Sequence, residues 1–347
     1  MKNVAILLEG ESNHESAKTA MGLIRFSEYH IVGVIDSEQE GKTTQEVLRC
    51  GGSIPFFASL RSLMERGLAV DTVIVGCSYA GGKIPLHMRP VIKEAIQCGL
   101  TVMSGLHELL EEDLEFSQLA KQYNSQLIDI RHMRNQQYVS RYHPHREHTK
   151  TLLTVGSDCD VGKMTTTLLL NQAAKQHQFN SIFAATGQTG IMIAGHGVPV
   201  DRTISDYTIG LVSQYVANLT QEHDLVFVEG QGGILHGNIS LGIFQGSDPD
   251  YLVLCHEVSR RTMKYYEMWE VPPLERFIQV YEEVGTWVRS KKPAKILGVS
   301  LNTRSLSDAE ALNYIQQAQE QLKLPVIDPV RYGVKKLWEA IENQINE

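Results

Sequence analysis

Residues 151–170 have the sequence TLLTVGSDCDVGKMTTTLLL, and the organisation of the chain is predicted outward from this stretch. Residues 152–155 are apolar or β-branched, as expected of a buried strand. Gly156 and Gly162 bound a short turn, and Lys163 then opens a helical pattern. Such a turn presents consecutive backbone N–H groups and a helix N-terminus to an anion, and the lysine adds a positive charge. The stretch therefore predicts a phosphate-binding loop between a strand and a helix.

The predicted phosphate loop departs from the usual pattern in two ways. Its glycines are separated by residues 157–161, one residue more than the pattern has. Met164 stands where a Ser or Thr normally binds Mg²⁺, and Thr165 follows it. The longer loop resembles that of dethiobiotin synthetase and related ATP-dependent enzymes. A loop that lacks the hydroxyl at 164 is expected to hold a phosphate-bearing group without splitting it, while the alternative is that the glycines only shape a tight turn.

Composition excludes several classes of protein. A chain of 347 residues is long enough for two domains. Its net charge of −8, from 32 basic and 40 acidic residues, argues against general binding to nucleic acids or to anionic membranes. No apolar run has membrane-spanning length, and residues 1–12 lack a signal-peptide cleavage pattern. The five cysteines are scattered without a CxxC pair, so we expect a reduced, cytoplasmic protein without a structural metal.

Residues 1–132 alternate between strand and helix patterns, which predicts a parallel sheet with helices on both faces. Strands are predicted over residues 4–8, 30–35, 72–76, 101–104 and 127–130, and helices over 15–25, 44–49, 60–66, 88–98 and 114–123. Asp36 ends the second strand, a position typical of the ribose-binding acid of dinucleotide folds. No GxGxxG follows the first strand, so NAD is not the favoured ligand of this Rossmann-like domain.

Residues 133–150 are polar and basic and are interpreted as an interdomain linker; their three histidines are read as solvated, not as metal ligands. Residues 151–347 form the predicted P-loop domain. Four of its strands end in the polar stretches GSDCDVGK, ATGQTG, EGQGG and CHE. Because parallel strands share one carboxyl edge, these stretches can meet in one pocket. The predicted fold class is therefore α/β, with a Rossmann-like parallel sheet followed by a P-loop NTPase-like parallel sheet.

Short motifs along nearly the whole chain together resemble one family. They are AKTA at 17–20, YAGG at 79–82, SGLH at 104–107, DIR at 129–131, TVGSDC at 154–159, VGK at 161–163, ATGQTG at 185–190, VEGQG at 228–232, LCHE at 254–257 and DPVR at 328–331. The combination resembles the DgcN-like D-glutamate N-acetyltransferase family, formerly a domain of unknown function. That family has a Rossmann-like N-terminal domain and a P-loop C-terminal domain. The resemblance implies acetyl transfer from acetyl-CoA to the amino group of an acidic D-amino acid.

The resemblance gives the unusual loop a chemical reason. Coenzyme A carries a pyrophosphate and a 3′-phosphate, which a P-loop can hold without hydrolysis, so the loss of the hydroxyl at 164 would be tolerated. Lys163 would be the charge partner of these phosphates. The residues expected to bind the cofactor are Gly156, Ser157, Asp158, Val161, Gly162, Lys163, Met164, Thr165, Thr186, Gly187, Gln188, Thr189 and Gly190.

Acetyl transfer needs a base for the substrate ammonium and donors for the tetrahedral oxyanion. Glu229 is the first candidate for the base, and an equal alternative is that it orients a metal-bound water; Asp158 and His256 follow. Backbone amides in residues 187–190 and 230–233 are candidate oxyanion donors. An acidic substrate also needs cations, for which arginine offers two parallel hydrogen bonds. The residues expected to bind the substrate are Arg131, Gly230, Gln231, Arg260 and Arg261.

Two other functions remain open from the sequence. An ATP-dependent ligase or kinase is favoured by the extended loop and by EGQGG, and Met164 counts against it. A non-catalytic nucleotide or CoA sensor would bind tightly without turnover. In each case the expected ligand is a small molecule, with no nucleic acid or membrane as partner. Two-domain α/β enzymes often pair, so a homo-oligomer is expected.

Overall fold

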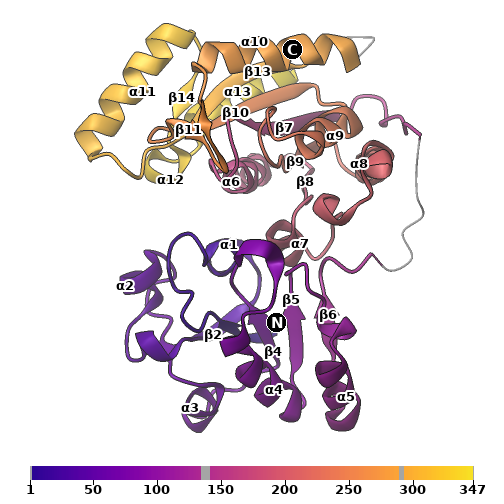
Figure 1. Cartoon of the computed structure of the whole chain (residues 1–347). Coiled ribbons are helices and arrows are strands. Elements are labelled where there is room, and N and C mark those ends of the chain that lie inside the picture. Colours follow the sequence, from indigo (N-terminus) through magenta and orange to yellow (C-terminus); the bar gives the residue numbers. More distant parts are fainter. Residues whose placement is uncertain (1, 134–140, 289–292, 347) are drawn as a thin grey trace. The chain divides into compact units, whose positions relative to one another are not determined.

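The computed structural model describes residues 2–133, 141–288 and 293–346, so residues 134–140 of the predicted linker lie outside the described residues. The chain divides into two compact units. The first comprises Met1–Gln136 and Gln188–Gly195, and the second comprises Gln137–Gly187 and His196–Glu347. Each unit contains a six-stranded sheet whose paired strands are all parallel. The predicted α/β class with two parallel sheets is confirmed (Figure 1).

The sheet of the first unit has the strand order β3-β2-β1-β4-β5-β6. This is the order of the Rossmann fold, and it reverses between β1 and β4. The strands predicted from the sequence are present, and the two-residue strand β3 was not predicted. The bounds are β1 Asn3–Leu7, β2 His30–Ile35, β3 Phe56–Phe57, β4 Thr72–Val75, β5 Thr101–Ser104 and β6 Leu127–Asp129.

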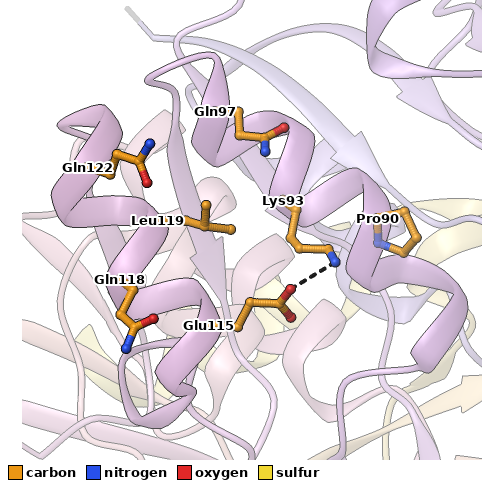
Figure 2. Close-up of a pocket in the computed structure, with 7 residues that line it drawn as sticks. All are labelled: Pro90, Lys93, Gln97, Glu115, Gln118, Leu119 and Gln122. Carbon is orange, nitrogen blue, oxygen red and sulfur yellow. Dashed lines mark hydrogen bonds and ion pairs between the residues drawn. The ribbon is translucent and has the colours of Figure 1, made fainter.

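The helices of this unit lie close to their predicted positions. They are α1 Lys18–Phe26, α2 Thr44–Leu48, α3 Leu60–Glu65, α4 Arg89–Gln97 and α5 Leu114–Tyr123, with 3₁₀ turns η1 Ser37–Gln39, η2 Ala80–Gly82, η3 Leu86–Met88 and η4 Leu110–Glu112. A shallow surface groove lies between α4 and α5 (Figure 2). Lys93 and Glu115 bridge it with an ion pair of 2.9 Å. The lining is otherwise mostly glutamine, so nothing in it has the chemistry of a catalytic site.

Helix α7, Gln188–Ala194, packs against α1 and belongs to the first unit, although it follows strand β8 of the second. Residues 185–190 are predicted from the sequence as a polar stretch at the end of a strand of the P-loop domain, whereas a helix begins at Gln188 and residues 188–195 group with the first unit. Two glycines and two hydroxyl residues favour a turn locally. Met192 is buried in the core of the first unit and Ile193 packs against that core, and such tertiary burial stabilises a short helix that would not form alone.

The sheet of the second unit has the order β14-β13-β10-β7-β9-β8, with the phosphate-loop strand β7 in its interior. Its strands are β7 Lys150–Gly156, β8 Ser181–Ala184, β9 Leu225–Val228, β10 Tyr251–Glu257, β13 Lys295–Asn302 and β14 Val326–Ile327. A separate antiparallel hairpin, which the sequence did not predict, follows β10. It consists of β11 Thr262–Met263 and β12 Tyr266–Glu270.

The helices of the second unit are α6 Lys163–Gln176, α8 Ser205–Thr220, α9 Asn238–Ser247, α10 Leu274–Val288, α11 Asp308–Leu322, α12 Pro329–Tyr332 and α13 Lys335–Asn346, with the 3₁₀ turn η5 Val200–Arg202. Trp338 of α13 is buried in a core with Leu152 and Phe227. Its ring packs edge-on against that of Phe179, with 5.3 Å between the two ring centroids. Among the described residues, no helix is both long and apolar enough to cross a membrane.

Gly76, directly after β4, leads to a prediction about packing in the first unit. A Cβ at this position would lie 2.3 Å from Cγ2 of Ile6 and 3.1 Å from Cβ of Ala20. We expect Gly76→Ala to lower the free energy of unfolding by about 1–3 kcal/mol, because overpacking forces neighbouring atoms apart. Urea unfolding measures this. The double variant with Ile6→Ala should lose less stability than the sum of the two single losses; strict additivity would contradict the proposed clash.

Candidate functional site

The phosphate loop connects β7 to α6 and folds closely around Lys163. The lysine is buried, its Nζ donates a hydrogen bond of 2.8 Å to the carbonyl oxygen of Asp158, and burial lowers its pKa. A Cβ on Gly156 would lie 2.7 Å from that Nζ, which explains why glycine stands there. Gly162 adopts φ +105°, a left-handed conformation that favours glycine. The predicted strand, turn and helix are confirmed.

Three threonines follow Met164 in the first turns of α6, at positions 165, 166 and 167. The hydroxyl of Thr166 lies 2.7 Å from that of Ser300, and the hydroxyl of Thr167 lies 2.8 Å from that of Thr154, so both are occupied in the interior. Met164 and Thr165 are half-buried. Unlike those of Thr166 and Thr167, the hydroxyl of Thr165 makes no hydrogen bond with the residues that the structure describes.

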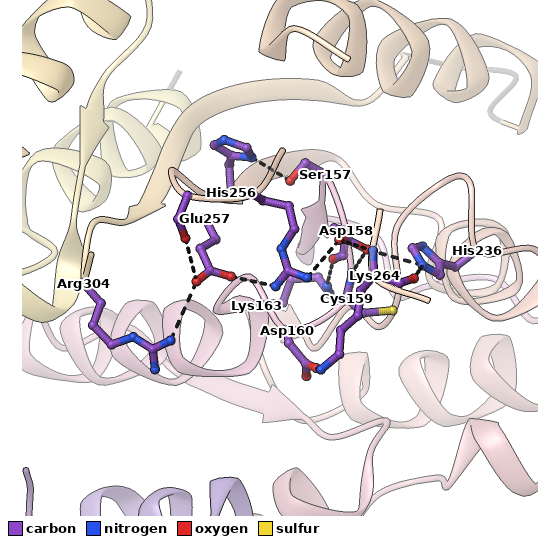
Figure 3. Close-up of polar contacts among 12 residues, drawn as sticks. Ser157, Asp158, Cys159, Asp160, Lys163, His236, His256, Glu257, Lys264 and Arg304 are labelled. Atoms are coloured by element: carbon purple, nitrogen blue, oxygen red, sulfur yellow. Dashed lines mark hydrogen bonds and ion pairs between the residues drawn. The ribbon is translucent and has the colours of Figure 1, made fainter. Parts of the chain in front are cut away.

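Asp158 is fully buried and its carboxylate is the centre of a polar cluster (Figure 3). Oδ1 accepts the backbone N–H of Cys159 at 2.6 Å and lies 3.3 Å from Nε2 of His236. Oδ2 accepts the backbone N–H of Lys264 at 2.9 Å and lies 3.3 Å from the guanidinium of Arg260. A carboxylate with so many partners is an anchor for the loop, which leaves it little capacity to act as the base suggested by the sequence.

The hairpin of β11 and β12 is attached to the loop through its turn, at Lys264. Besides its N–H bond to Asp158, Lys264 pairs through Nζ with Asp160 at 2.6 Å, and its carbonyl lies 3.2 Å from Nε2 of His236. The next residue, Tyr265, has φ +71°, which is unusual for a bulky side chain and costs of order 1–3 kcal/mol. The hairpin therefore holds a strained turn that its contacts with the phosphate loop stabilise.

His256, at the end of β10, lies under the loop. Its Nδ1 is 2.8 Å from the hydroxyl of Ser157, and both side chains are buried. Burial lowers the pKa of His256 to about 4, so the ring is neutral at physiological pH. A neutral histidine of such low basicity is a weak proton acceptor, and the geometry favours a role in holding Ser157.

Glu229, directly after β9, has the properties of a group that titrates near neutrality. Its Oε2 accepts the backbone N–H groups of Thr186 at 3.0 Å and of Gly187 at 3.1 Å. Burial raises the pKa of this carboxyl to about 7, against the opposing effect of these two hydrogen bonds and of Lys163. Oε1 receives no hydrogen bond from the residues that the structure describes, which leaves one oxygen for a proton.

The residues around Glu229 are packed closely against the phosphate loop. A Cβ on Gly230 would lie 1.8 Å from the carbonyl oxygen of Thr154, so any side chain there would separate β9 from β7. Gln231 donates through Nε2 to the carbonyl oxygen of Thr186 at 2.6 Å, and the hydroxyl of Thr186 donates to the carbonyl of Glu229 at 2.8 Å. Gly230 and Gln231, predicted to bind substrate, thus position the Glu229 loop.

The predicted arginines lie in different surroundings. Arg260 donates to Glu257 at 2.6 Å in addition to its contact with Asp158, whereas Arg261 is exposed. Arg131 is buried in the first unit, where it donates to Oε1 of Gln188 at 2.8 Å. Gln188, Thr189 and Gly190, predicted to bind the cofactor, also belong to the first unit, because they begin α7.

Asp158, Cys159 and His236 form a group that the sequence did not predict. Each offers one ligand atom, and these atoms lie within 4.8 Å of one another, which suits a metal ion. The guanidinium of Arg260 competes with a cation for the Asp158 carboxylate. Burial raises the pKa of the Cys159 thiol, so it is not an activated nucleophile.

His236 and Lys264 are the site residues that sequence reasoning missed. Both lie in segments that have neither a regular spacing of apolar residues nor a phosphate-binding motif. The signal for His236 was its position five residues after Gln231 of EGQGG. Lys264 gave no local signal, because its role depends on the hairpin bringing it to Asp158 and Asp160.

Replacement of Asp158 tests its role as an anchor. We expect Asp158→Ala to lower the free energy of unfolding by about 1–3 kcal/mol, because the backbone N–H groups of Cys159 and Lys264 lose their acceptor while Arg260 keeps its bond to Glu257. Asp160→Asn is the control: this acid is partly exposed and asparagine tolerates its left-handed backbone (φ +58°), so the loss should be less than about 1 kcal/mol. Urea unfolding measures both, and equal losses would contradict the assignment.

Glu229→Gln tests the raised pKa without an activity assay. Between pH 4.5 and about 7 the unfolded chain ionises Glu229 while the folded chain keeps it protonated, so the wild type loses stability over this window. The glutamine variant avoids that loss, so its stability relative to wild type should rise by about 3 kcal/mol from pH 4 to pH 8. A flat difference between Glu229→Gln and wild type over this pH range would rule out the raised pKa.

Comparison with known proteins places the chain in a family. A model described as "Domain of unknown function (DUF1611_C) P-loop domain" matches residues 139–338, and "Domain of unknown function (DUF1611_N) Rossmann-like domain" matches residues 37–133. A Tritonibacter scottomollicae protein named D-glutamate N-acetyltransferase is 32% identical over 330 residues, which is 94% of each chain. A Pseudoalteromonas sp. protein of the same name is 33% identical over 274 residues, covering 78% of this chain and 81% of the relative.

A solved structure agrees with these matches. The crystal structure of a DUF1611 family protein from Anabaena variabilis is 30% identical in sequence and superposes with a TM-score of 0.90, covering 99% of this chain and 100% of the other. The family resemblance found in the sequence is confirmed. The chain therefore belongs to the DUF1611 family, with its Rossmann-like N-terminal domain and its P-loop C-terminal domain.

Proposed function

We propose that this protein is an N-acetyltransferase that moves acetyl from acetyl-CoA to the amino group of an acidic D-amino acid, D-glutamate. The observation that carries the proposal is the similarity over 94% of the chain to a relative named D-glutamate N-acetyltransferase. The second relative has the same name. The remaining parts of the proposal, a homo-oligomer in the cytoplasm, come from the sequence alone.

The phosphate loop is the proposed site for the phosphates of CoA. Its amides and the N-terminus of the 14-residue helix α6 favour anions. The loop also carries Asp158 and Asp160, whose negative charges oppose phosphate, and these are offset by Arg260 and Lys264. Lys163, the backbone amides of the loop and the helix N-terminus then remain as the proposed attraction for the phosphates.

Glu229 is the proposed general base. Its carboxylate takes one proton from the substrate ammonium, and the freed amine attacks the carbonyl carbon of the thioester. The tetrahedral intermediate then expels the CoA sulfur, and the second nitrogen proton passes to that thiolate, giving the N-acetyl amino acid and free CoA thiol. A base with a pKa of about 7 suits this work, because it is partly ionised at neutral pH and still basic enough to accept a proton.

The two carboxylates of the acceptor require cations that are not already neutralised. In the second unit Arg261 is an exposed arginine next to Arg260 in the sequence, while Arg260 is held by Glu257 and Asp158. Arg261 is therefore the first residue proposed to bind a substrate carboxylate.

An assay of free thiol tests the reaction. Purified protein is given acetyl-CoA with D- or L-amino acids, and in parallel ATP with Mg²⁺ while ADP is followed. We expect thiol release that depends on D-glutamate and is lost in Lys163→Ala. ADP release without thiol would instead support the ATP-dependent ligase or kinase, with the Thr165 hydroxyl as the ligand of the metal. Ligand binding without either product would support a sensor.

The pH dependence of the rate tests the base. Because Glu229 must be ionised to accept a proton, kcat/KM should rise with pH and level off above about 7. Glu229→Gln should lower kcat by roughly 10²–10⁴, with little change in KM for acetyl-CoA. Steady-state rates from pH 5.5 to 9 measure both. A Gln variant that retained the wild-type rate would exclude Glu229 as the base.

A further inference from the structure

His236, in the segment after β9, has a ring nitrogen whose partner is unexplained. Its Nε2 lies 3.2 Å from the carbonyl oxygen of Lys264 and 3.3 Å from Oδ1 of Asp158. Because a carbonyl oxygen can only accept, Nε2 carries the hydrogen, and Nδ1 of the neutral ring then holds a lone pair. Nδ1 is buried and makes no hydrogen bond with the residues that the structure describes. A buried lone pair without a donor is costly unless a bound partner from outside the chain takes it.

A thiol and a carboxylate lie close to this ring. Sγ of Cys159, a carboxylate oxygen of Asp158 and a ring nitrogen of His236 lie within 4.8 Å of one another (Figure 3). Asp158 is fully buried and the side chain of His236 is 10% exposed, whereas Cys159 is half-buried. The thiol is a free cysteine. The group is therefore largely removed from water, and its sulfur is the donor that solvent reaches.

The mixture of donor atoms determines which ion fits the group. Zinc takes thiolate, imidazole and carboxylate ligands together, whereas Mg²⁺ and Ca²⁺ are bound through oxygen. A histidine that binds a metal usually donates its other ring N–H to a carbonyl or a carboxylate, which fixes the ring. His236 has both kinds of acceptor, from Lys264 and Asp158. Three protein ligands leave the fourth position of a tetrahedral ion to water or a small anion.

The positive charges next to the group have carboxylate partners of their own. Arg260 donates to Glu257 at 2.6 Å, and Lys264 pairs with Asp160 at 2.6 Å. The contact of Arg260 with Asp158 is the longer of its two, at 3.3 Å. Arg260 therefore keeps its stronger partner when a metal ion takes its place at the Asp158 carboxylate.

We propose that Asp158, Cys159 and His236 form a binding site for a divalent cation of the zinc type, which replaces Arg260 at the Asp158 carboxylate. This inference goes beyond the proposed acetyl transfer and does not depend on it. The Cys159 thiol gives its proton to solvent as the metal–sulfur bond forms. The ligands come from the phosphate loop and from the segment after β9, so the ion fastens these two segments of the second unit to each other.

Titration of the purified full-length chain with Co²⁺ tests the site, because Co²⁺ substitutes for zinc in tetrahedral sites and is coloured. The protein is kept reduced with a reductant that carries no thiol. We expect the near-ultraviolet band of a cobalt–thiolate bond together with the strong visible bands of tetrahedral Co²⁺. Zn²⁺ should abolish both, and excess Mg²⁺ should leave them unchanged. Zn²⁺ should also raise the melting temperature, since it binds the folded chain.

Two variants remove ligands, and two are matched controls. Cys159→Ser should lose the thiolate band, and His236→Gln should weaken zinc binding about tenfold or more. Cys98→Ser and His177→Gln change an exposed cysteine and an exposed histidine, so both should keep the spectrum and the zinc affinity of wild type. Competition with a coloured chelator measures the affinity.

Arg260→Gln distinguishes a metal site from a polar cluster that only stabilises the fold. Removal of the guanidinium takes away a positive charge and a competitor for the Asp158 carboxylate. Zinc binding should therefore become several-fold tighter, although the variant loses contacts that stabilise the chain. Loss of a ligand and loss of the competitor thus change the affinity in opposite directions.

Wild type without a thiolate band, or a band that persists in folded Cys159→Ser, would overturn the proposal. Wild-type zinc affinity in His236→Gln, or an affinity of Arg260→Gln no higher than that of wild type, would do the same. Melting curves establish that each variant is folded, and if one is not, the wild-type spectrum and the remaining variants decide. None of these measurements uses acetyl-CoA, so failure of the acetyl transfer and failure of the metal site are told apart.

Discussion

The buried carboxylate of Asp158 is the constraint on which the second unit's site depends. A carboxylate removed from water is tolerable only when hydrogen bonds and opposite charges compensate it. Here the partners come from three separate segments: the loop itself through Cys159, the segment after β9 through His236, and the segment after β10 through Arg260 and, in the hairpin turn, Lys264. The Asp158 carboxylate thus connects the phosphate loop, the segment that follows Glu229 and the hairpin through its hydrogen bonds and ion pairs. The strain at Tyr265 is tolerated for the same reason.

Much of the fold could be predicted because the apolar residues of its strands and helices recur at regular spacings along the sequence. The apolar strands β7 and β9, and the glycines around Lys163, specify a P-loop unit from sequence alone. Motifs at strand ends also pointed to the carboxyl edge of the sheet, where Glu229 and His256 lie. The alternation of strands and helices in residues 1–132 gave the Rossmann-like sheet for the same reason.

The parts that could not be predicted depend on contacts distant in sequence. Residues 186–190 have the composition of a turn, and only the burial of Met192 in the other unit's core explains the helix. The partners that occupy the Asp158 carboxylate, Arg260 and Lys264, could not be foreseen because they lie about a hundred residues away. His256 looked reactive in sequence, while its burial shows a neutral ring. Burial and partner count, which decide the chemistry of an ionisable group, are properties of the folded chain.

The hydrogen bond between Lys163 and the carbonyl of Asp158 has a consequence for selectivity. The lysine already has a partner inside the protein, so an incoming anion has to replace that bond before it gains the full attraction of the ammonium. A small monovalent anion offers too little in exchange. An anion that also reaches the helix N-terminus and the neighbouring cations gains several interactions at once. Under the proposed binding of CoA, the loop would therefore favour a ligand with several phosphates over chloride or a single phosphate.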